Sequence, residues 1–494
     1  MKLPGTQTAL LFASLLCCIA PQGYAQPQSI PNATATDAGN VSTSEEASEE
    51  AAQQAQSPIQ ILHIEQPVPL ERIEEGQSAR FSEQFAAAQS DSEESEAGVY
   101  ADLTPQQQAY LQRLEDIGNF DQIVEDLEIQ GGAWSLQIAE ELNGLGDLLQ
   151  AQGSYDRSIE IFDRAVHINR VNNGLFSPTQ VPLIQKIVRA HMAMGQWQEA
   201  DQRQQYAFYV QTRAYRIDDP RMIDVFARLA RWNIATFYRG IDGDPGPRLF
   251  QTYMLYKTAA ESVAAHFGTR DPRYVGLLRD TAGAADMLDR FALKGENIGT
   301  RINPDLRMVS EFAGRENGPR GRETGGELAL QQIIDYYNDP NREASEENLL
   351  GRARALAELG DWYLMRERRQ AAMRAYKDAY DQLAAAPDGE ELLPRVFGEI
   401  VFLPAFSRFD AQRKEAVGVG PDTGARMGYV DMAFDVSEYG RLSNFEVLAV
   451  EPEDAVRADV QVISAIKSTL VRPRIIAGEA TESRLERYRF SFWY

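Results

Sequence analysis

Hydrophobic and polar residues follow three successive patterns along the 494-residue chain. From residue 26 to about residue 105, polar and acidic residues dominate and the apolar residues show no period. From residue 106 to about residue 387, apolar and small residues recur every three or four positions, which predicts amphipathic helices. From residue 388 onward, residues with a period of two predict strands around one helix. The sequence therefore predicts a helical middle followed by a small α+β domain.

A unit of two helices repeats within the middle region. The stretch "LGDLLQAQGSYDRSIEIFDRA" (145–165) aligns with "IVRAHMAMGQWQEADQRQQYA" (187–207) at an offset of 42 residues. The matching pairs are Gly153 and Gly195, Tyr155 and Trp197, Ala165 and Ala207, and Pro178 and Pro220. In each unit we expect a first helix, a turn at the glycine, a second helix and a stop at the proline. Ala165 and Ala207 are expected where helices cross closely.

A third first helix is expected over 224–238, with its partner helix after the loop "GIDGDPGP". The spacing of small residues resembles tetratricopeptide (TPR) repeats of the kinesin-light-chain-like kind. A further unit at 359–380 keeps this spacing, with Leu359, Gly360, Ala372, Tyr376 and Ala379 in place of Leu145, Gly146, Ser158, Phe162 and Ala165. The resemblance implies a solenoid of TPR-like repeats over 106–300, a degenerate insert of helices and loops over 301–345, and a helix pair over 346–387.

In a solenoid of this kind, first-helix positions that do not pack usually meet a ligand. The residues predicted to bind a protein partner in this way are Asn143, Asp147, Gln150, Gln185, Arg189 and Arg231. The competing interpretation is that they are ordinary solvated side chains on a helix exterior.

The last region reads strand, strand, helix, strand. Alternating residues from Val430 to Val436 turn at "SEYG" into a second strand from Leu442, and a helix follows with an apolar stripe. The residues of that stripe are Val456, Val460, Ile463 and Ile466. The closing strand alternates the aromatic residues Tyr488, Phe490, Phe492 and Tyr494 with a second, outward face.

This order, with "VDMAFDVSEYGRL", "AIKSTLVRPRI" and the turn "AGEA", resembles the C-terminal domain of the TonB family of energy transducers over about 70 residues. The whole domain is expected over residues 388–494. The resemblance implies that the final strand lies beside the first strand and leaves its other edge open to a partner's strand. The residues predicted to meet such a partner are Arg487, Arg489, Phe490, Ser491 and Trp493. The alternative is an edge capped by the lead-in at 397–410. The "YP" motif of that family is absent.

The N-terminus predicts export. Residues 1–25 have one lysine, a short apolar run and "GYA" before Gln26, which is typical of a cleaved signal peptide and predicts a periplasmic protein of a Gram-negative cell envelope. Residues 26–105 carry 15 Asp or Glu against two Arg, and we interpret them as a disordered acidic tether. Within it, the more apolar stretch 58–73 is either a docking strand or a stickier piece of tether, and the second interpretation is favoured.

Charge and composition narrow the function. A formal charge of −24 argues against nucleic acid as a partner. The mature chain would hold no cysteine, its histidines have no ligand spacing, and no catalytic motif is found, so the sequence predicts no enzyme, no metal and no cofactor. The prediction is a non-enzymatic scaffold that binds protein partners through the solenoid and the terminal domain. The alternative is an atypical TonB-family energy transducer anchored by an uncleaved N-terminal segment.

Overall fold

The computed structural model describes residues 59–73, 133–241, 245–293, 319–342, 345–403, 409–420, 423–453 and 457–494, together with residues 122, 125, 126, 128, 129 and 455. The predicted signal peptide, and all of the predicted tether except residues 59–73, lie outside the described residues. In the part of the chain that is described, no helix has both the length and the apolar character that crossing a membrane requires.

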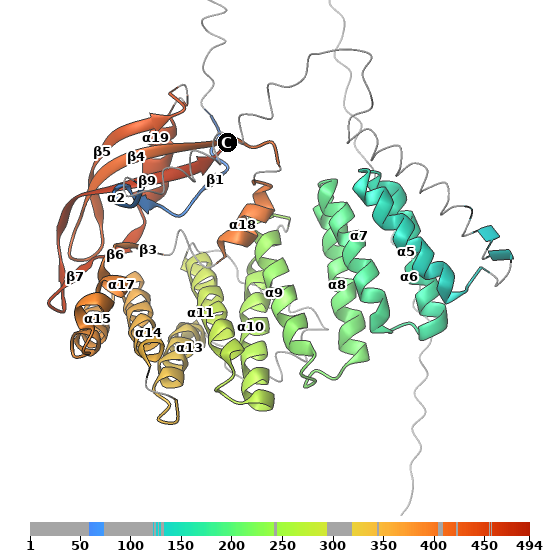
Figure 1. The fold of residues 1–494 in the computed structure, drawn as a ribbon, viewed down its shortest axis with the longest axis horizontal. Helices are drawn as coiled ribbons and strands as arrows, with labels where there is room; N and C mark the ends of the chain where they lie inside the picture. Colours follow the sequence, from blue (N-terminus) through green and yellow to red (C-terminus); the bar gives the residue numbers. More distant parts are fainter. Residues whose placement is uncertain are drawn as a thin grey trace, which may run out of the picture. The chain divides into compact units, whose positions relative to one another are not determined.

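The middle of the chain is a TPR-like solenoid, in which each helix packs on the next in chain order (Figure 1). The helices form successive antiparallel pairs of about 13 to 22 residues, as the 42-residue repeat requires. They are α5 (Leu136–Ala151), α6 (Tyr155–Asn173), α7 (Val181–Ala193), α8 (Trp197–Ala214), α9 (Met222–Arg239), α10 (Gly246–Phe267), α11 (Pro272–Leu293), α13 (Pro319–Tyr337), α14 (Glu346–Met365) and α15 (Arg369–Ala384).

Small residues allow the two helices of a pair to approach closely. A Cβ atom on Gly146 would lie 2.3 Å from the ring of Phe162, and a Cβ on Gly360 would lie 2.3 Å from the ring of Tyr376. Each glycine therefore leaves room for an aromatic ring from the second helix. The aligned positions of the two units make the same glycine–aromatic contact. Ala165 and Ala207 are buried, as expected for residues at close helix crossings.

The insert predicted over 301–345 is more regular than expected. The helix α13 occupies residues 319–337 and packs between α11 and α14, so it belongs to the solenoid. Residues 294–318 lie outside the described residues. The sequence did not show that α13 belongs to the solenoid, because α13 lacks the small-residue spacing of the other units. Its glycines Gly325 and Gly326 instead admit Tyr253 and Trp362, where a Cβ would lie 2.1 and 2.0 Å from the side chains.

The C-terminal domain has the predicted order of strand, strand, helix and strand. It consists of β4 (Met427–Val436), β5 (Leu442–Glu451), α19 (Ala458–Ile466) and β9 (Ser483–Trp493), with the turn at Gly440 in a left-handed conformation. The main sheet has the order β1-β9-β4-β5, and β2 also pairs with β9. Tyr488, Phe490 and Phe492 are buried in its core, which confirms the predicted aromatic face.

The predicted stripe of α19 is partly wrong. Ala458, Val462 and Ile466 are buried, whereas Val460 is 57% exposed. Ile463 is partly buried against the same core, and Val456 lies outside the described residues. Because α19 begins only at Ala458, its buried face follows the spacing of these three residues and leaves Val460 toward solvent.

The lead-in at 397–410 does not cap β9. Its strand β3 (Val401–Leu403) pairs with β6 (Leu470–Arg472), and β7 (Arg474–Ile476) pairs with β8 (Glu479–Thr481) in a hairpin. The preceding short helices α16 (Gly389–Leu392) and α17 (Pro394–Phe397) pack in the same apolar cluster as α14 and α15. The lead-in thus joins the terminal domain to the solenoid.

We predict that Gly360→Ala lowers the free energy of unfolding by about 1–3 kcal/mol, because the new methyl group has to displace the buried ring of Tyr376. Gly276→Ala is the matched control: it also lies inside a helix, but its added Cβ meets nothing within 4 Å. The control should be neutral or up to about 1 kcal/mol more stable. Urea denaturation followed by circular dichroism measures both, and equal effects would show that the Gly360–Tyr376 contact is not a packing constraint.

Candidate protein-interaction sites

The outer edge of β9 is covered by a segment from far upstream in the same chain. The segment comprises residues 59–73, with β1 (His63–Ile64), β2 (Val68–Pro69) and α2 (Leu70–Arg72); we call it the strap. Both strands run antiparallel to β9, with His63 opposite Trp493 and Val68 opposite Arg489. The prediction that this edge is open is therefore wrong, and so is the interpretation of residues 59–73 as tether.

Apolar contacts seat the strap. Ile64, Leu70 and Ile73 are buried, and Ile64 belongs to the core between the sheet and α19. The side-chain amide of Gln461, on α19, donates to the carbonyl oxygen of Ile59 at 2.7 Å. The strap therefore contributes to the core of the C-terminal domain as well as to its sheet.

A charged cluster joins the strap to α18 (Asp410–Val417) and to β9. His63 Nε2 lies 3.1 Å from Asp410 Oδ1, and Lys414 Nζ lies 2.5 Å from Glu65 Oε2 and 3.3 Å from Asp410 Oδ2. The indole Nε1 of Trp493 donates to Glu65 Oε1 at 2.5 Å. His63 is 1% exposed, so this cluster closes over a buried imidazole.

The cluster has the donor atoms of a metal site but already contains a cation. Single ligand atoms of His63, Glu65 and Asp410 lie within 4.8 Å of one another. Zinc binds such nitrogen and oxygen donors. However, the ammonium group of Lys414 contacts both carboxylates, so a metal ion would have to displace it. We therefore describe the cluster as an ion-pair network.

The pKa values of Asp410 and Lys414 both move in the direction that favours their charged forms. Burial raises the pKa of Asp410, but hydrogen bonds and charges from His63 and Lys414 outweigh it and bring that pKa below its ordinary value. Burial lowers the pKa of Lys414, but the hydrogen bonds and charges of Glu65 and Asp410 together outweigh it and raise that pKa. The contribution of Asp410 to stability is thus present above its ordinary pKa and is lost as the pH falls through the lowered one. That of Lys414 is present below its ordinary pKa and is lost as the pH rises through the raised one.

A buried ion pair fixes the C-terminal domain to the last helix pair. Arg472, on β6, donates from Nε to Asp361 Oδ1 on α14 at 2.8 Å, and from Nη1 to the carbonyl oxygen of Val396 at 3.2 Å. The hydroxyl of Tyr376 donates to the same Asp361 oxygen at 2.8 Å. Asp361 and Arg472 are each 7% exposed. Burial and the neighbouring Asp361 charge together raise the pKa of the Tyr376 hydroxyl, so it remains a hydrogen-bond donor.

Four of the polar residues predicted on the solenoid contact a neighbouring helix. Lys186 on α7 donates to Asn143 Oδ1 and to Asp147 Oδ2, both at 2.6 Å, and Gln150 donates to the Lys186 carbonyl oxygen at 2.8 Å. Gln185 donates to Gln204 at 2.8 Å. Arg189 and Arg231 are exposed, as is Asp147.

The residues predicted to meet a partner on the closing strand also include both exposed residues and residues that contact other parts of the chain. Arg487 is exposed, whereas Phe490 and Ser491 are buried. Arg489 donates two bonds to Asp431, at 2.7 and 2.8 Å. Trp493 is 6% exposed and lies against the strap. The set was predicted to face a partner, and what it faces in this structure is mostly the chain's own strap and β4.

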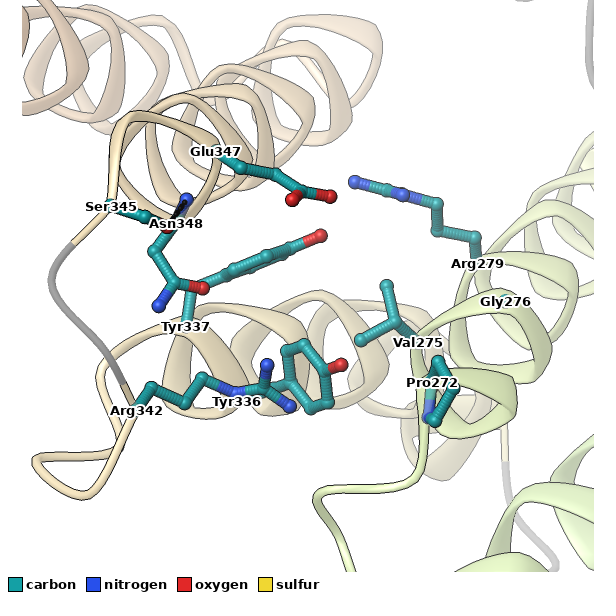
Figure 2. A pocket seen from close by; sticks show the side chains of 10 residues that line it. All are labelled: Pro272, Val275, Gly276, Arg279, Tyr336, Tyr337, Arg342, Ser345, Glu347 and Asn348. Atoms are coloured by element: carbon teal, nitrogen blue, oxygen red, sulfur yellow. Dashed lines mark hydrogen bonds between the residues drawn. The ribbon is translucent and has the colours of Figure 1, made fainter.

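The solenoid also holds a cavity of about 520 Å³ between α11, the end of α13 and the start of α14. Figure 2 shows Glu347 and Arg279 facing each other over the ring of Tyr337. Arg279 also donates to Glu358 at 3.0 Å, and the guanidinium of Arg342 lies 3.5 Å from the ring centre of Tyr336. Both arginines already have partners, and the exposed carboxylate of Glu347 adds to the polar, aromatic surface of the cavity.

The sequence analysis missed the residues that hold the strap, His63, Glu65, Asp410 and Lys414. The available signal was the stretch 59–73 itself, whose apolar residues interrupt an acidic region. Nothing in the local pattern points to α18 as its partner, because the two are joined only in the folded chain.

Comparisons with known proteins give no family. No protein-family model and no curated protein matches the chain. Among solved structures, nearly identical TPR-like repeats of a kinesin light chain from Podosopora anserina match with 16% identity and a TM-score of 0.32, covering 51% of this chain and 97% of that one. A variant of the same protein matches with 17% identity and a TM-score of 0.31, covering 50% and 94%. BtubC (BKLC) from P. vanneervenii matches with 11% identity and a TM-score of 0.30, covering 55% and 91%. The chain forms a TPR-like solenoid because its own helices pack as successive antiparallel pairs.

We predict that Arg472→Met lowers the free energy of unfolding by about 3–5 kcal/mol, because it leaves the Asp361 carboxylate buried without its charge partner. The triple variant Asp361→Leu, Tyr376→Phe, Arg472→Met removes all three side-chain polar groups and should regain most of that loss. Guanidinium denaturation compares the two. A triple variant no more stable than the single one would mean that shape, and not the unpaired charge, sets the cost.

Proposed function

We propose that this chain is a protein-interaction scaffold of a Gram-negative cell envelope, in which the solenoid binds one protein and the C-terminal domain binds a second. The observation that carries the proposal is the strap on β9: this edge accepts an extended segment as an added antiparallel strand. An edge that holds one such segment has the backbone geometry to hold another. The TonB-like order of the domain supports the same role, and the N-terminal export signal supports a periplasmic location.

The solenoid side of the proposal rests on Arg189 and Arg231. They lie 42 residues apart, at equivalent positions of the first helices α7 and α9, and both are exposed. Equivalent positions on successive repeats form a row, and a row of two cations fits an acidic stretch of a partner protein. We propose no enzymatic step for either part.

We predict that the double variant Arg189→Glu, Arg231→Glu loses one crosslinked protein in a pull-down from the cell envelope and keeps the proteins that bind the C-terminal domain. Charge reversal at two contacts replaces attraction with repulsion, so recovery of that protein should fall about tenfold or more.

The matched control is Arg157→Glu, Arg374→Glu, which makes the same charge change at exposed positions of the second helices α6 and α15. The control should recover the same proteins as the wild type. If both double variants lose the same proteins equally, only the net charge matters and the row on the first helices is not a binding site.

A further inference from the structure

We propose that the strap competes with partner strands for the β9 edge. A partner strand binds there by displacing the strap, and it carries the same pattern as the strap, an aliphatic residue followed by an acidic one. This inference rests on the proposed function, because it specifies the strand that the C-terminal domain takes and the step that must precede binding.

The strap occupies the backbone positions that a partner needs. The amide of Leu62 donates to the Trp493 carbonyl oxygen at 2.9 Å, and the amide of Glu65 donates to the Ser491 carbonyl oxygen at 2.8 Å. A strand cannot be added to this edge while those acceptors are taken. Binding of a partner therefore requires release of the strap.

The strap makes an incomplete ladder. It pairs with β9 only over two short stretches, and the register shifts by one residue between Ile64 opposite Phe492 and Val68 opposite Arg489. Pro67 and Pro69 have no amide hydrogen to donate. An uninterrupted strand without proline would make more backbone bonds to the same edge, which gives it an advantage over the strap.

Two adjacent strap residues show what the edge recognises. Ile64 is buried in the core, and Glu65, the next residue, points to the opposite face as strand alternation requires. There its two carboxylate oxygens meet different donors, the indole of Trp493 and the ammonium of Lys414. The edge thus combines an apolar seat with a site for a carboxylate, and a partner segment fits when it supplies both in this order.

The competition is intramolecular. The strap belongs to the same chain as β9, so its local concentration at the edge does not fall when the protein is diluted. A free segment has to exceed this, unless the strap is weakened. Weakening the strap alone should therefore raise the affinity for an added strand without any change in β9.

The test uses a dye-labelled synthetic peptide with the sequence of residues 59–73 as the probe. Fluorescence anisotropy measures its binding to the full chain carrying Ile64→Asp in its own strap. We expect this variant to bind the peptide about tenfold or more tightly than the wild type. A peptide carrying Glu65→Lys should bind the variant several-fold more weakly, because its ammonium faces Lys414.

The matched control is Ile476→Asp, which makes the same exchange on β7, outside the strap, at a side chain that is 60% exposed. It should bind the peptide like the wild type. If the Ile64→Asp variant binds no better than the wild type, or if the Glu65→Lys peptide binds as well as the native one, the inference is wrong. The assay contains only this chain, so its outcome does not depend on whether envelope partners exist.

Hydrogen exchange on the unmodified protein tests release of the strap without relying on a variant that could unfold. The amides of Leu62 and Glu65 should exchange about tenfold or more faster than the β9 amides that face β4, because the strap opens while the sheet stays folded. Exchange of both groups at the same rate would make the strap an integral strand that leaves only on global unfolding, and would overturn the proposal.

Discussion

The carboxylate of Asp361 is buried and therefore needs a charge partner. The residue that pairs with it attaches the C-terminal domain to the solenoid. Its partner Arg472 comes from β6, so the domain cannot leave α14 without exposing two charges to an apolar cluster. In the first unit the equivalent residue, Asp147, pairs with Lys186 of the following helix pair. The C-terminal domain thus uses the docking position that one repeat offers to the next.

Sequence alone was enough for features that depend on near neighbours. The glycine and aromatic positions of a helix pair, such as Gly146 with Phe162, lie within one repeat, and their spacing shows in the sequence. The hairpin around Gly440 was readable for the same reason. The strap was not, because its few apolar residues gain a partner only when β9 is placed beside them. Likewise, the sequence does not show that a polar residue such as Asn143 has a partner, because Lys186 comes from the next helix pair.

A continuous set of contacts leads from the solenoid to the β9 edge. Phe409 stacks against Tyr256 of α10 with ring centres 6.1 Å apart, and Arg239 of α9 donates to the Ala416 carbonyl oxygen at 3.1 Å. The helix that these contacts hold, α18, carries the two residues that pair with the strap. Contacts from α9 and α10 and the ion pairs of the strap therefore meet at one short helix.

The pairing of Glu65 with Trp493 joins residues 428 positions apart. Ribosomes add about 5–20 residues per second, so the strap emerges roughly 20–90 seconds before the strand that receives it. Throughout that interval Ile64, Leu70 and Ile73 have no β9 to cover them. A chaperone or the export machinery that shields these residues during synthesis therefore binds a segment whose partner strand β9 has not yet been synthesised.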